Sequence, residues 1–475
     1  MAAKFAWEKY DEKHIKKLEK LCKEYREFLD NGKTERECVD TIVNGIEKEG
    51  YRELESLMKE GATLKKGDKV YSVWMNKSIV MYRIGSKPMS EGINILGAHI
   101  DSPRLDVKQK PLYEDSDHSF AYLDTHYYGG VKKYQWVTLP LALHGVVVKK
   151  DGTTVELNIG ENEDDPVFFI SDLLVHLAGE QLDKKAEKVI EGEALDLIVG
   201  SRPISIGEEE KNTDEGKKKA ASAVKAGILD ILKKTYDIEE DDFLSAEIEV
   251  VPAGKAREAG LDRSMILAYG HDDRVCAFTS VKAMLDVKET ERTLCCILVD
   301  KEEIGSVGAT GMRSRFFENS LAELMNLTGE YSELNMRRCL AHSCMLSSDV
   351  SAAFDPNFRS SFETKNTAWL GAGMVFNKFT GARGKSGSND ANAEYIAHIR
   401  KILDDKEIMY QTAELGKVDA GGGGTIAYIL ALYGMNVIDS GVAVLNMHAP
   451  WEAVSKADVY ETYRGYKAFA EKASM

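Results

Sequence analysis

Short apolar segments alternate with amphipathic segments along most of the chain. Residues 8–30 carry apolar side chains at helical spacing, and Asn31-Gly32 is a helix-ending signal. Val70–Met75 and Ser78–Ile84 predict a hairpin, and the apolar segment Ile93–Ala98 predicts a further, buried strand. Because strands and helices that alternate pack as layers, the pattern predicts an α/β fold, a mixed sheet flanked by helices.

The same alternation resumes at about residue 246 and continues to the end of the chain. Strands are predicted over Ile248–Pro252, Ser264–Tyr269, Thr293–Val299, Cys344–Leu346, Gly371–Phe376 and Gly441–Leu445. Helices are predicted over Val275–Leu285, Ala391–Leu403, Thr425–Tyr433 and Ser455–Glu471.

Residues 105–250 have a different texture, rich in tyrosine, histidine and charge. They contain strand-like segments, a predicted helix over Val167–Leu182, and the charged segment Glu208–Lys219, which indicates a solvated loop. We therefore predict one discontinuous main domain, made of residues 1–104 and 251–475, and a mainly-β domain inserted into it over residues 105–250.

Composition narrows the functional classes. A chain of 475 residues is too long for one ordinary core, and its net charge of −16 argues against a nucleic-acid partner, which needs a basic face. The seven cysteines show no paired metal spacing. The first ten residues hold no apolar signal core, and no uninterrupted apolar run reaches the length of a membrane span. We expect a cytoplasmic protein with no membrane partner.

The segment Ile93–Arg104, INILGAHIDSPR, places a histidine and an aspartate just after a predicted strand. In extended backbone alternate residues point to the same face, so His99 and Asp101 would project together. A carboxylate that accepts the ring N–H of a histidine fixes its tautomer and makes the other nitrogen a better metal ligand. The alternative is a buried histidine with an ordinary hydrogen-bond partner.

Five predicted strands share one property: each is followed directly by residues of the types that bind metals. The carboxyl ends of strands in an open α/β sheet are where ligands bind, so these side chains are predicted to form one shared site. A single such residue would be an ordinary capping acid or loop residue. The candidates are His99 with Asp101, Asp272 with Asp273, Glu302 with Glu303, Asp349, and His448.

Two histidines and several carboxylates suit zinc better than magnesium, with cobalt or manganese as alternatives. They are too many for one tetrahedral ion, so we predict two divalent ions and a hydrolase that activates water. In the pair Glu302-Glu303, one carboxylate would bind metal while the other serves as the general base. The alternative for this pair is an acidic surface patch.

These residues together resemble the aspartyl aminopeptidase family of dinuclear zinc peptidases. The motifs that carry the resemblance are His99-x-Asp101, Asp-Asp-Arg at 272–274, Glu302-Glu303, Ser-Ser-Asp349, Asn-Met-His448 and Gly422–Ile426. The resemblance implies that His99 and Glu303 are divided between the two ions, that Asp272 bridges them, and that Asp349 and His448 complete the ligands. It also implies that Asp101 orients His99 and that Glu302 is the base.

The resemblance further implies an inserted dimerisation domain, a large homo-oligomer, typically a tetrahedral dodecamer, and peptide substrates with a free N-terminus. Lys378 would pair with an acidic N-terminal side chain, although residues 381–395 differ from the strictly acid-specific branch, so that Lys385 or simple exposure of Lys378 are alternatives. His176 is a second candidate substrate residue, or else a core histidine on an apolar helix face. Gly423 would let the backbone approach the substrate.

Two other readings of the sequence remain. A related amidohydrolase, such as a deacylase or carboxypeptidase, or an aminopeptidase of broad specificity would use the same two-metal core. A non-catalytic scaffold with this fold would lack the base or some ligands, whereas Glu302 and every expected ligand are present.

Overall fold

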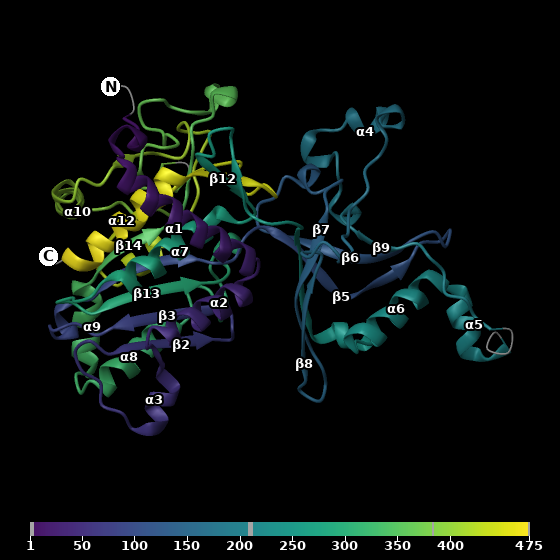
Figure 1. The fold of residues 1–475 in the computed structure, drawn as a ribbon, viewed down its shortest axis with the longest axis horizontal. Coiled ribbons are helices and arrows are strands. Elements are labelled where there is room, and N and C mark those ends of the chain that lie inside the picture. Colours follow the sequence, from purple (N-terminus) through teal and green to yellow (C-terminus); the bar gives the residue numbers. More distant parts are fainter. Residues whose placement is uncertain (1–3, 208–211, 382–383, 474–475) are drawn as a thin grey trace. The chain divides into compact units, whose positions relative to one another are not determined.

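The computed structural model describes residues 4–207, 212–381 and 384–473. It divides the chain into two compact units (Figure 1). The main unit comprises the chain up to Ser102, Ala256–Met447 and the chain from Trp451 on, and the inserted unit comprises Pro103–Lys255 with His448–Pro450. The predicted fold class, a mixed α/β sheet flanked by helices with a mainly-β insertion, is confirmed.

A nine-stranded mixed sheet forms the centre of the main unit. Its four adjacent strands β13, β4, β14 and β18 are parallel, and antiparallel partners flank them on both sides. In spatial order the strands are β1 (Arg52–Glu53), β2 (Lys69–Trp74), β3 (Ser78–Arg83), β13 (Leu294–Val299), β4 (Asn94–His99), β14 (Cys344–Ser348), β18 (Asn436–Gly441), β16 (Met374–Asn377) and β17 (Tyr410–Thr412).

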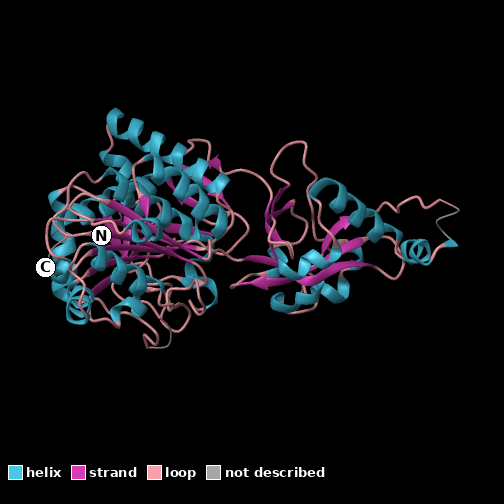
Figure 2. Cartoon of the chain, turned by 90° about the horizontal axis from the view of Figure 1, so that it is seen from below, coloured by secondary structure: helices cyan, strands magenta, loops and turns pink. Residues whose placement is uncertain are grey.

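Helices cover both faces of this sheet (Figures 1 and 2). Alternate residues of a buried strand point to opposite faces, so Leu96 of β4 packs into one core and Ile95 into the other. The first core contains α1 (Glu12–Asn31), α2 (Glu35–Lys48), α7 (His271–Asp286), α10 (Ala393–Asp405) and α12 (Lys456–Lys472). The second contains α3 (Leu54–Glu60), α8 (Phe316–Leu327), α9 (Glu333–His342) and α11 (Ala427–Ala431).

A second, five-stranded sheet in the main unit corrects one expectation. Two of the five strands predicted to meet at one sheet edge, over 264–269 and 441–445, contribute β12 and β19 to this separate sheet, because they pair with β20 instead of with the parallel strands. Its order is β11 (Arg257–Ala259), β12 (Met265–Ala268), β20 (Glu452–Ser455), β19 (Ala443–Leu445) and β15 (Ser351–Ala352).

The inserted unit is built on a six-stranded antiparallel sheet. Its order is β8 (Thr154–Ile159), β7 (Leu141–Val148), β10 (Ala246–Pro252), β5 (Arg104–Glu114), β6 (Ala121–Tyr128) and β9 (Leu197–Gly200). The helices α4 (Gly179–Leu182), α5 (Asp214–Ala221) and α6 (Ala223–Tyr236) belong to the same unit.

Two local predictions in the inserted unit are wrong. The expected helix over Val167–Leu182 is reduced to a 3-10 turn, Val175–Leu177, and the four residues of α4, because its leucines face solvent and no core supports a longer helix. Part of the expected loop Glu208–Lys219 is helical from Asp214 on, and its residues 208–211 lie outside the described part of the chain.

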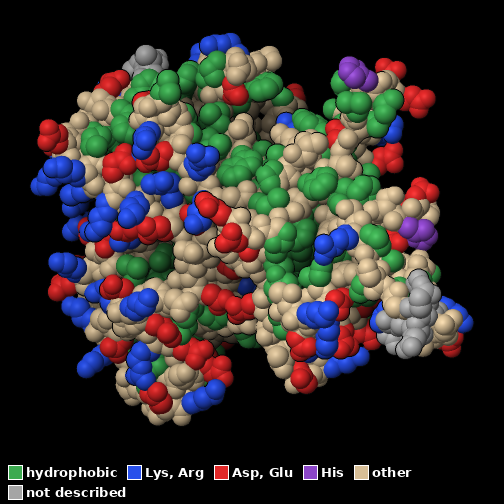
Figure 3. Space-filling view, turned by 45° about the vertical axis from the view of Figure 1, so that its right-hand side comes forward, with side chains coloured by type: hydrophobic (Ala, Val, Ile, Leu, Met, Phe, Trp, Pro, Cys, Tyr) green, Lys and Arg blue, Asp and Glu red, His purple; other side chains and the backbone are tan. Residues whose placement is uncertain are grey.

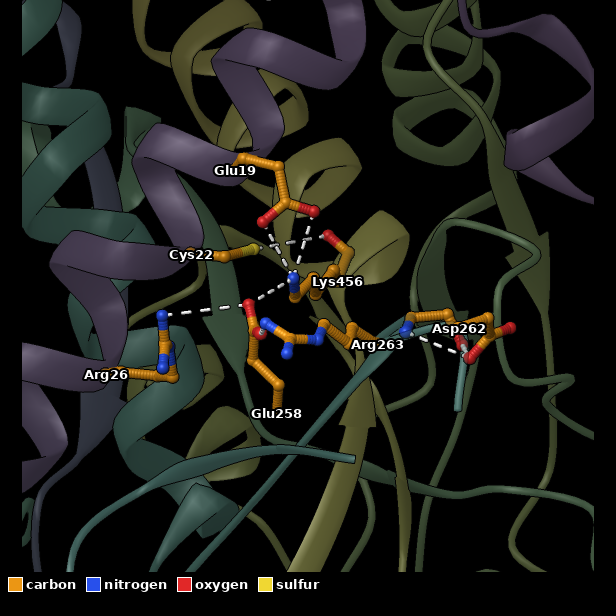
Figure 4. Close-up of polar contacts among 8 residues, drawn as sticks. Glu19, Cys22, Arg26, Glu258, Asp262, Arg263 and Lys456 are labelled. Atoms are coloured by element: carbon orange, nitrogen blue, oxygen red, sulfur yellow. Dashed lines mark hydrogen bonds and ion pairs between the residues drawn. The ribbon is translucent and has the colours of Figure 1, made fainter. Parts of the chain in front are cut away.

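Charges are spread over the surface in view, where acidic and basic side chains are interspersed (Figure 3). One lysine is an exception, because its side chain is fully buried: the ammonium of Lys456, at the start of α12, lies 2.7–2.9 Å from carboxylate oxygens of Glu19 and Glu258 (Figure 4). This contact ties α12 to α1 and β11. Within the described residues, the structure contains no helix with the length and apolarity needed to cross a membrane.

Candidate metal centre

The three central parallel strands bring three of the predicted residues to one edge of the sheet. His99 is the last residue of β4, Glu302 begins the 3-10 helix Glu302–Ile304 just after β13, and Asp349 follows β14. Since β13 and β14 each pair with β4 in parallel register, their carboxyl ends lie side by side.

Asp272 reaches the same place from the first turn of α7. The turn before it requires glycine, because Gly270 has φ +73° and an added Cβ there would lie 2.0 Å from Nη1 of Arg274. The backbone N–H of Asp272 donates to Oε2 of Glu452 at 3.0 Å, and the Ser102 hydroxyl donates to its carbonyl at 2.7 Å. These contacts hold the peptide groups on both sides of the carboxylate.

His99 lies between two carboxylates and is buried. Its Nδ1 is 3.2 Å from Oδ1 of Asp101, and its Nε2 is 3.2 Å from Oδ1 of Asp272. Burial alone would lower the pKa of His99, but the hydrogen bonds to Asp101 and Asp272 outweigh it and raise the pKa well above its usual value. Nδ1 therefore faces both the carboxylate of Asp101 and its backbone carbonyl oxygen, which lies 3.0 Å away, and Nε2 faces the cluster.

Asp101 has a further contact that the sequence did not reveal. Its two carboxylate oxygens accept the backbone N–H groups of Glu302 and Glu303, each at 3.2 Å, and its side chain is fully buried. One carboxylate thus positions both the histidine on β4 and the two glutamates after β13. The sequence did not reveal this role because Asp101 and the two glutamates lie about 200 residues apart in the chain.

Potential ligand atoms of six residues gather within short range. Within each of three overlapping groups they lie within 4.8 Å of one another: His99 with Glu302 and Asp349, His99 with Asp272 and Glu303, and Asp272 with Asp273 and Asp349. Asp273 is one of the candidates that follow the predicted strands, although the family resemblance assigned it no ligand role.

The charge of this cluster fits a bound divalent cation. Burial raises the pKa of Asp349 well above its usual value, and the carboxylates of Glu302 and Asp272 raise it further. Such mutually repelling buried carboxylates are stabilised when a metal ion lies among them. An imidazole nitrogen beside carboxylate oxygens is also the donor set that zinc prefers.

His448 is placed differently from the other predicted ligands. It groups with the inserted unit, where its Nδ1 lies 3.0 Å from the carbonyl oxygen of Gly130. The three groups of potential ligand atoms in the described residues do not include it. It therefore stays a predicted ligand.

The structure also describes the three predicted substrate residues. The Lys378 ammonium is half-exposed and lies 2.5 Å from Oδ1 of Asp390, which Lys385 also contacts at 3.2 Å. His176 is exposed on the turn Val175–Leu177, so the expectation of an apolar helix face is wrong there. Gly423 accepts a hydrogen bond from the N–H of Gly381 at 2.6 Å.

One buried carboxyl beside the cluster was missed entirely. Asp439, on β18, accepts a hydrogen bond from the Thr425 hydroxyl at 2.5 Å. Burial raises its pKa to about 7, and the nearby carboxylate of Glu302 adds to the shift. Asp439 lies within a strand, whereas the candidate ligands were sought among residues that directly follow a strand.

A cluster of a buried imidazole and buried or half-buried carboxylates, several of them at the carboxyl ends of parallel strands, is typical of metal-dependent hydrolases. Comparison with known proteins makes the class specific. Residues 28–470 match the family model described as aminopeptidase I zinc metalloprotease (M18). The chain belongs to this family, the aspartyl aminopeptidases, and is a zinc-dependent aminopeptidase. The resemblance noted in the sequence is thus confirmed.

Similar proteins span the whole chain. A probable M18 family aminopeptidase 1 of Clostridium acetobutylicum is 60% identical over 466 residues, which cover 98% of this chain and 97% of the relative. The crystal structure of an M18 aminopeptidase from Thermotoga maritima has a TM-score of 0.91 at 43% identity, with 100% of both chains covered. The mApe1 dodecamer of S. cerevisiae shares the fold, with a TM-score of 0.73 at 19% identity over 94% of this chain and 95% of the yeast chain.

Proposed function

We propose that this aminopeptidase works with two divalent metal ions, most simply zinc, bridged by Asp272. The observation that carries the proposal is that Asp272 belongs to two of the ligand groups, one with His99 and Glu303 and the other with Asp273 and Asp349. A carboxylate has two oxygens, so Asp272 could serve one ion with each. Cobalt or manganese would suit the same donors.

His448 would complete the ligand set. Its Nδ1–H donates to the Gly130 carbonyl, which leaves the lone pair on Nε2, the tautomer that a metal ligand needs. The hydrogen bond from Nδ1 of His99 toward Asp101 produces the same tautomer at the first ligand.

Glu302 is the proposed general base. When bound, the ions polarise the scissile carbonyl and acidify water. The carboxylate of Glu302 accepts a proton from the attacking water and returns it to the leaving amine of the peptide. Asp101 holds the backbone amide of Glu302, so the carboxylate is presented from a fixed turn. As an aminopeptidase, the protein is proposed to act on peptides with a free α-amine.

For substrate specificity we propose broad acceptance with a modest preference for acidic N-terminal residues. Lys378 supplies the positive charge for such a side chain, but Asp390 already holds its ammonium, so an acidic substrate has to compete with an internal carboxylate. Gly423 and His176 remain proposed substrate contacts.

We also propose a homo-oligomer, and the dodecamer solved for the yeast relative is the assembly we expect. The exposed Leu173, Leu174 and Leu177 of the inserted unit are consistent with burial in such an assembly. The cytoplasm is the proposed location, which suits seven cysteines that are all free and buried.

Glu302→Gln and Asp272→Asn test the two-metal proposal. Glu302→Gln is expected to keep about two ions per chain, because its carboxylate serves as base, and to lose about 10²–10⁴-fold in kcat on an N-terminal leucine peptide. Asp272→Asn is expected to lose metal. The measurements are the metal content by mass spectrometry and kcat on free and N-acetylated peptides, for wild type and both variants. One ion per active wild-type chain contradicts the metal pair, turnover of acetylated peptides favours a deacylase, and unchanged turnover of Glu302→Gln removes its role as base.

A further inference from the structure

A second cavity lies in the main unit, among residues to which the peptidase chemistry assigns no role. It has a volume of about 480 Å³, and residues of α1, α7 and α12 line it together with Lys406 and Ile408, which follow α10. This volume falls in the range typical of small-molecule sites, about 300–1,000 Å³.

The cavity is positively charged, although the chain as a whole carries a net charge of −16. Three carboxylates face it, from Glu24, Asp286 and Glu471. Twice as many cationic side chains face it: Lys17, Lys20, Lys282, Lys406, Arg464 and Lys467. Its walls therefore carry a net charge of +3, and cations that converge on one concave surface repel each other unless an anion lies between them.

Internal pairing accounts for only part of this charge. Lys282 lies 3.1 Å and Lys20 lies 3.9 Å from carboxylate oxygens of Glu24. Arg464 lies 2.8 Å from the buried carboxylate of Glu461, which is not one of the lining residues. Lys467 is paired with Glu471. For Lys17 and Lys406, by contrast, the described part of the chain provides no ion pair. Two ammonium groups thus remain for a ligand.

The floor of the cavity is apolar and aromatic. Leu21, Ile408 and Ala468 are buried or nearly so, and the rings of Tyr460 and Tyr463 lie beside each other with centroids 6.4 Å apart. The Tyr463 hydroxyl is held by Asp286 at 2.6 Å, which orients its ring. An ordinary solvated patch of lysines has no such floor, whereas an organic ligand needs one.

We propose that this cavity binds an oligophosphate ester, a compact ligand with two or more phosphate groups and an organic part. Lysine ammonium groups of the rim hold the phosphate oxygens by charge-assisted hydrogen bonds, and the tyrosine rings contact the organic part. The shared recognition chemistry is the phosphate chain, which either a nucleotide or an inorganic oligophosphate supplies. This binding is separate from peptide hydrolysis and does not depend on the number of ions in the metal centre.

Calorimetric titration of the full, assembled protein with ATP, inorganic tripolyphosphate and adenosine tests the proposal. At low ionic strength, ATP and tripolyphosphate are expected to bind at one site per chain, more weakly as salt is added, and adenosine not to bind. Tighter binding of ATP than of tripolyphosphate supports an ester whose organic part contacts the tyrosine rings, whereas equal binding of the two overturns the assignment of an organic part. Absence of binding by both phosphates overturns the proposal.

Two double variants locate the binding. Lys17→Ala with Lys406→Ala removes the two unpaired rim charges and is expected to weaken ATP binding about 10–100-fold. Lys16→Ala with Lys472→Ala removes the same charge from exposed positions outside the cavity and is expected to change it less than about twofold. Both variants should keep wild-type peptidase activity, which shows that they fold. ATP binding that survives unchanged in the first variant arises elsewhere, for example at the metal centre, and refutes the assignment.

Discussion

Asp101→Asn is the most informative single change at the metal centre, because the Asp101 side chain is fully buried and yet contacts three parts of the site. The carboxylate accepts the amide protons of Glu302 and Glu303, each at 3.2 Å, and faces Nδ1 of His99 at 3.2 Å. Asparagine has the same shape but only one oxygen, so its NH₂ group must face one of these donors.

The expected loss follows from these contacts. A hydrogen bond to a charged group is worth about 1.5–3 kcal/mol, and replacing the oxygen by a second donor removes at least one of them. If the NH₂ group faces His99, the imidazole loses its carboxylate partner and keeps only the backbone carbonyl oxygen of Asp101, 3.0 Å from Nδ1, which makes Nε2 a weaker metal ligand. We therefore expect metal affinity to fall about 10–100-fold, the range typical for loss of a group that orients a metal ligand. We expect kcat at saturating zinc to fall as well, because the turn that carries Glu302 loses its anchor.

Asp458→Asn is the matched control. Asp458 is also a buried aspartate that accepts two backbone N–H groups, from Gly371 and Gly373, both at 2.7 Å, but it is not among the potential metal ligands. Bound zinc, kcat at saturating zinc and the free energy of unfolding should be measured for both variants. Asp458→Asn should keep metal and turnover. If Asp101→Asn also keeps its zinc affinity and kcat within about twofold, Asp101 does not position the site.

Three further outcomes are expected. Lys378→Ala should lower kcat/KM for peptides with N-terminal aspartate or glutamate about 3–10-fold relative to leucine peptides, as loss of a partly exposed ion pair predicts. Lys385→Ala should leave this ratio unchanged. An equal loss on leucine peptides contradicts the role of Lys378. Lys456→Met should cost about 2–3 kcal/mol of unfolding free energy in urea, because it leaves the carboxylates of Glu19 and Glu258 without their cation; Glu19 is half-exposed, which limits the cost. Lys59→Met, at an exposed pair with Glu55, should leave the unfolding free energy almost unchanged. Equal costs for the two variants would show that burial of Lys456 is irrelevant. Burial raises the pKa of Asp458 from 3.8 to about 8, so between these pH values the folded chain holds a proton that the unfolded chain releases, and the unfolding free energy falls as pH rises. The stability of Asp458→Asn relative to wild type should therefore increase as the pH is raised from 5 to 8. A difference in unfolding free energy that stays constant over this range refutes the pKa shift.

Several features of this protein could be predicted from the sequence because they are local. Apolar periodicity located most strands and helices of the main unit. Residue type after a strand pointed to His99, Asp272, Glu302, Glu303 and Asp349, which the structure brings to one place. The order of the motifs was enough to indicate the family, which the comparisons confirm.

Other features depend on which segments become neighbours, and periodicity does not report that. It shows that a segment has a buried face but not which strand it pairs with, so β12 and β19 were assigned to the wrong sheet. Apolar periodicity also predicted a helix over Val167–Leu182, although a helix that packs on no core is not stabilised.

The sequence by itself determined most elements of the main unit, the family and the chemical types of the ligands, since these are encoded in short local patterns or in the order of such patterns along the chain. Only the tertiary structure decided that Asp101 holds the amides of two residues some 200 positions away, that Asp390 shares Lys378, and that α1, α7 and α12 enclose a cationic cavity. The physical reason is the same in each case. Hydrogen bonds, ion pairs and cavities join groups that are close in space, and the chain brings them together only when its cores are packed.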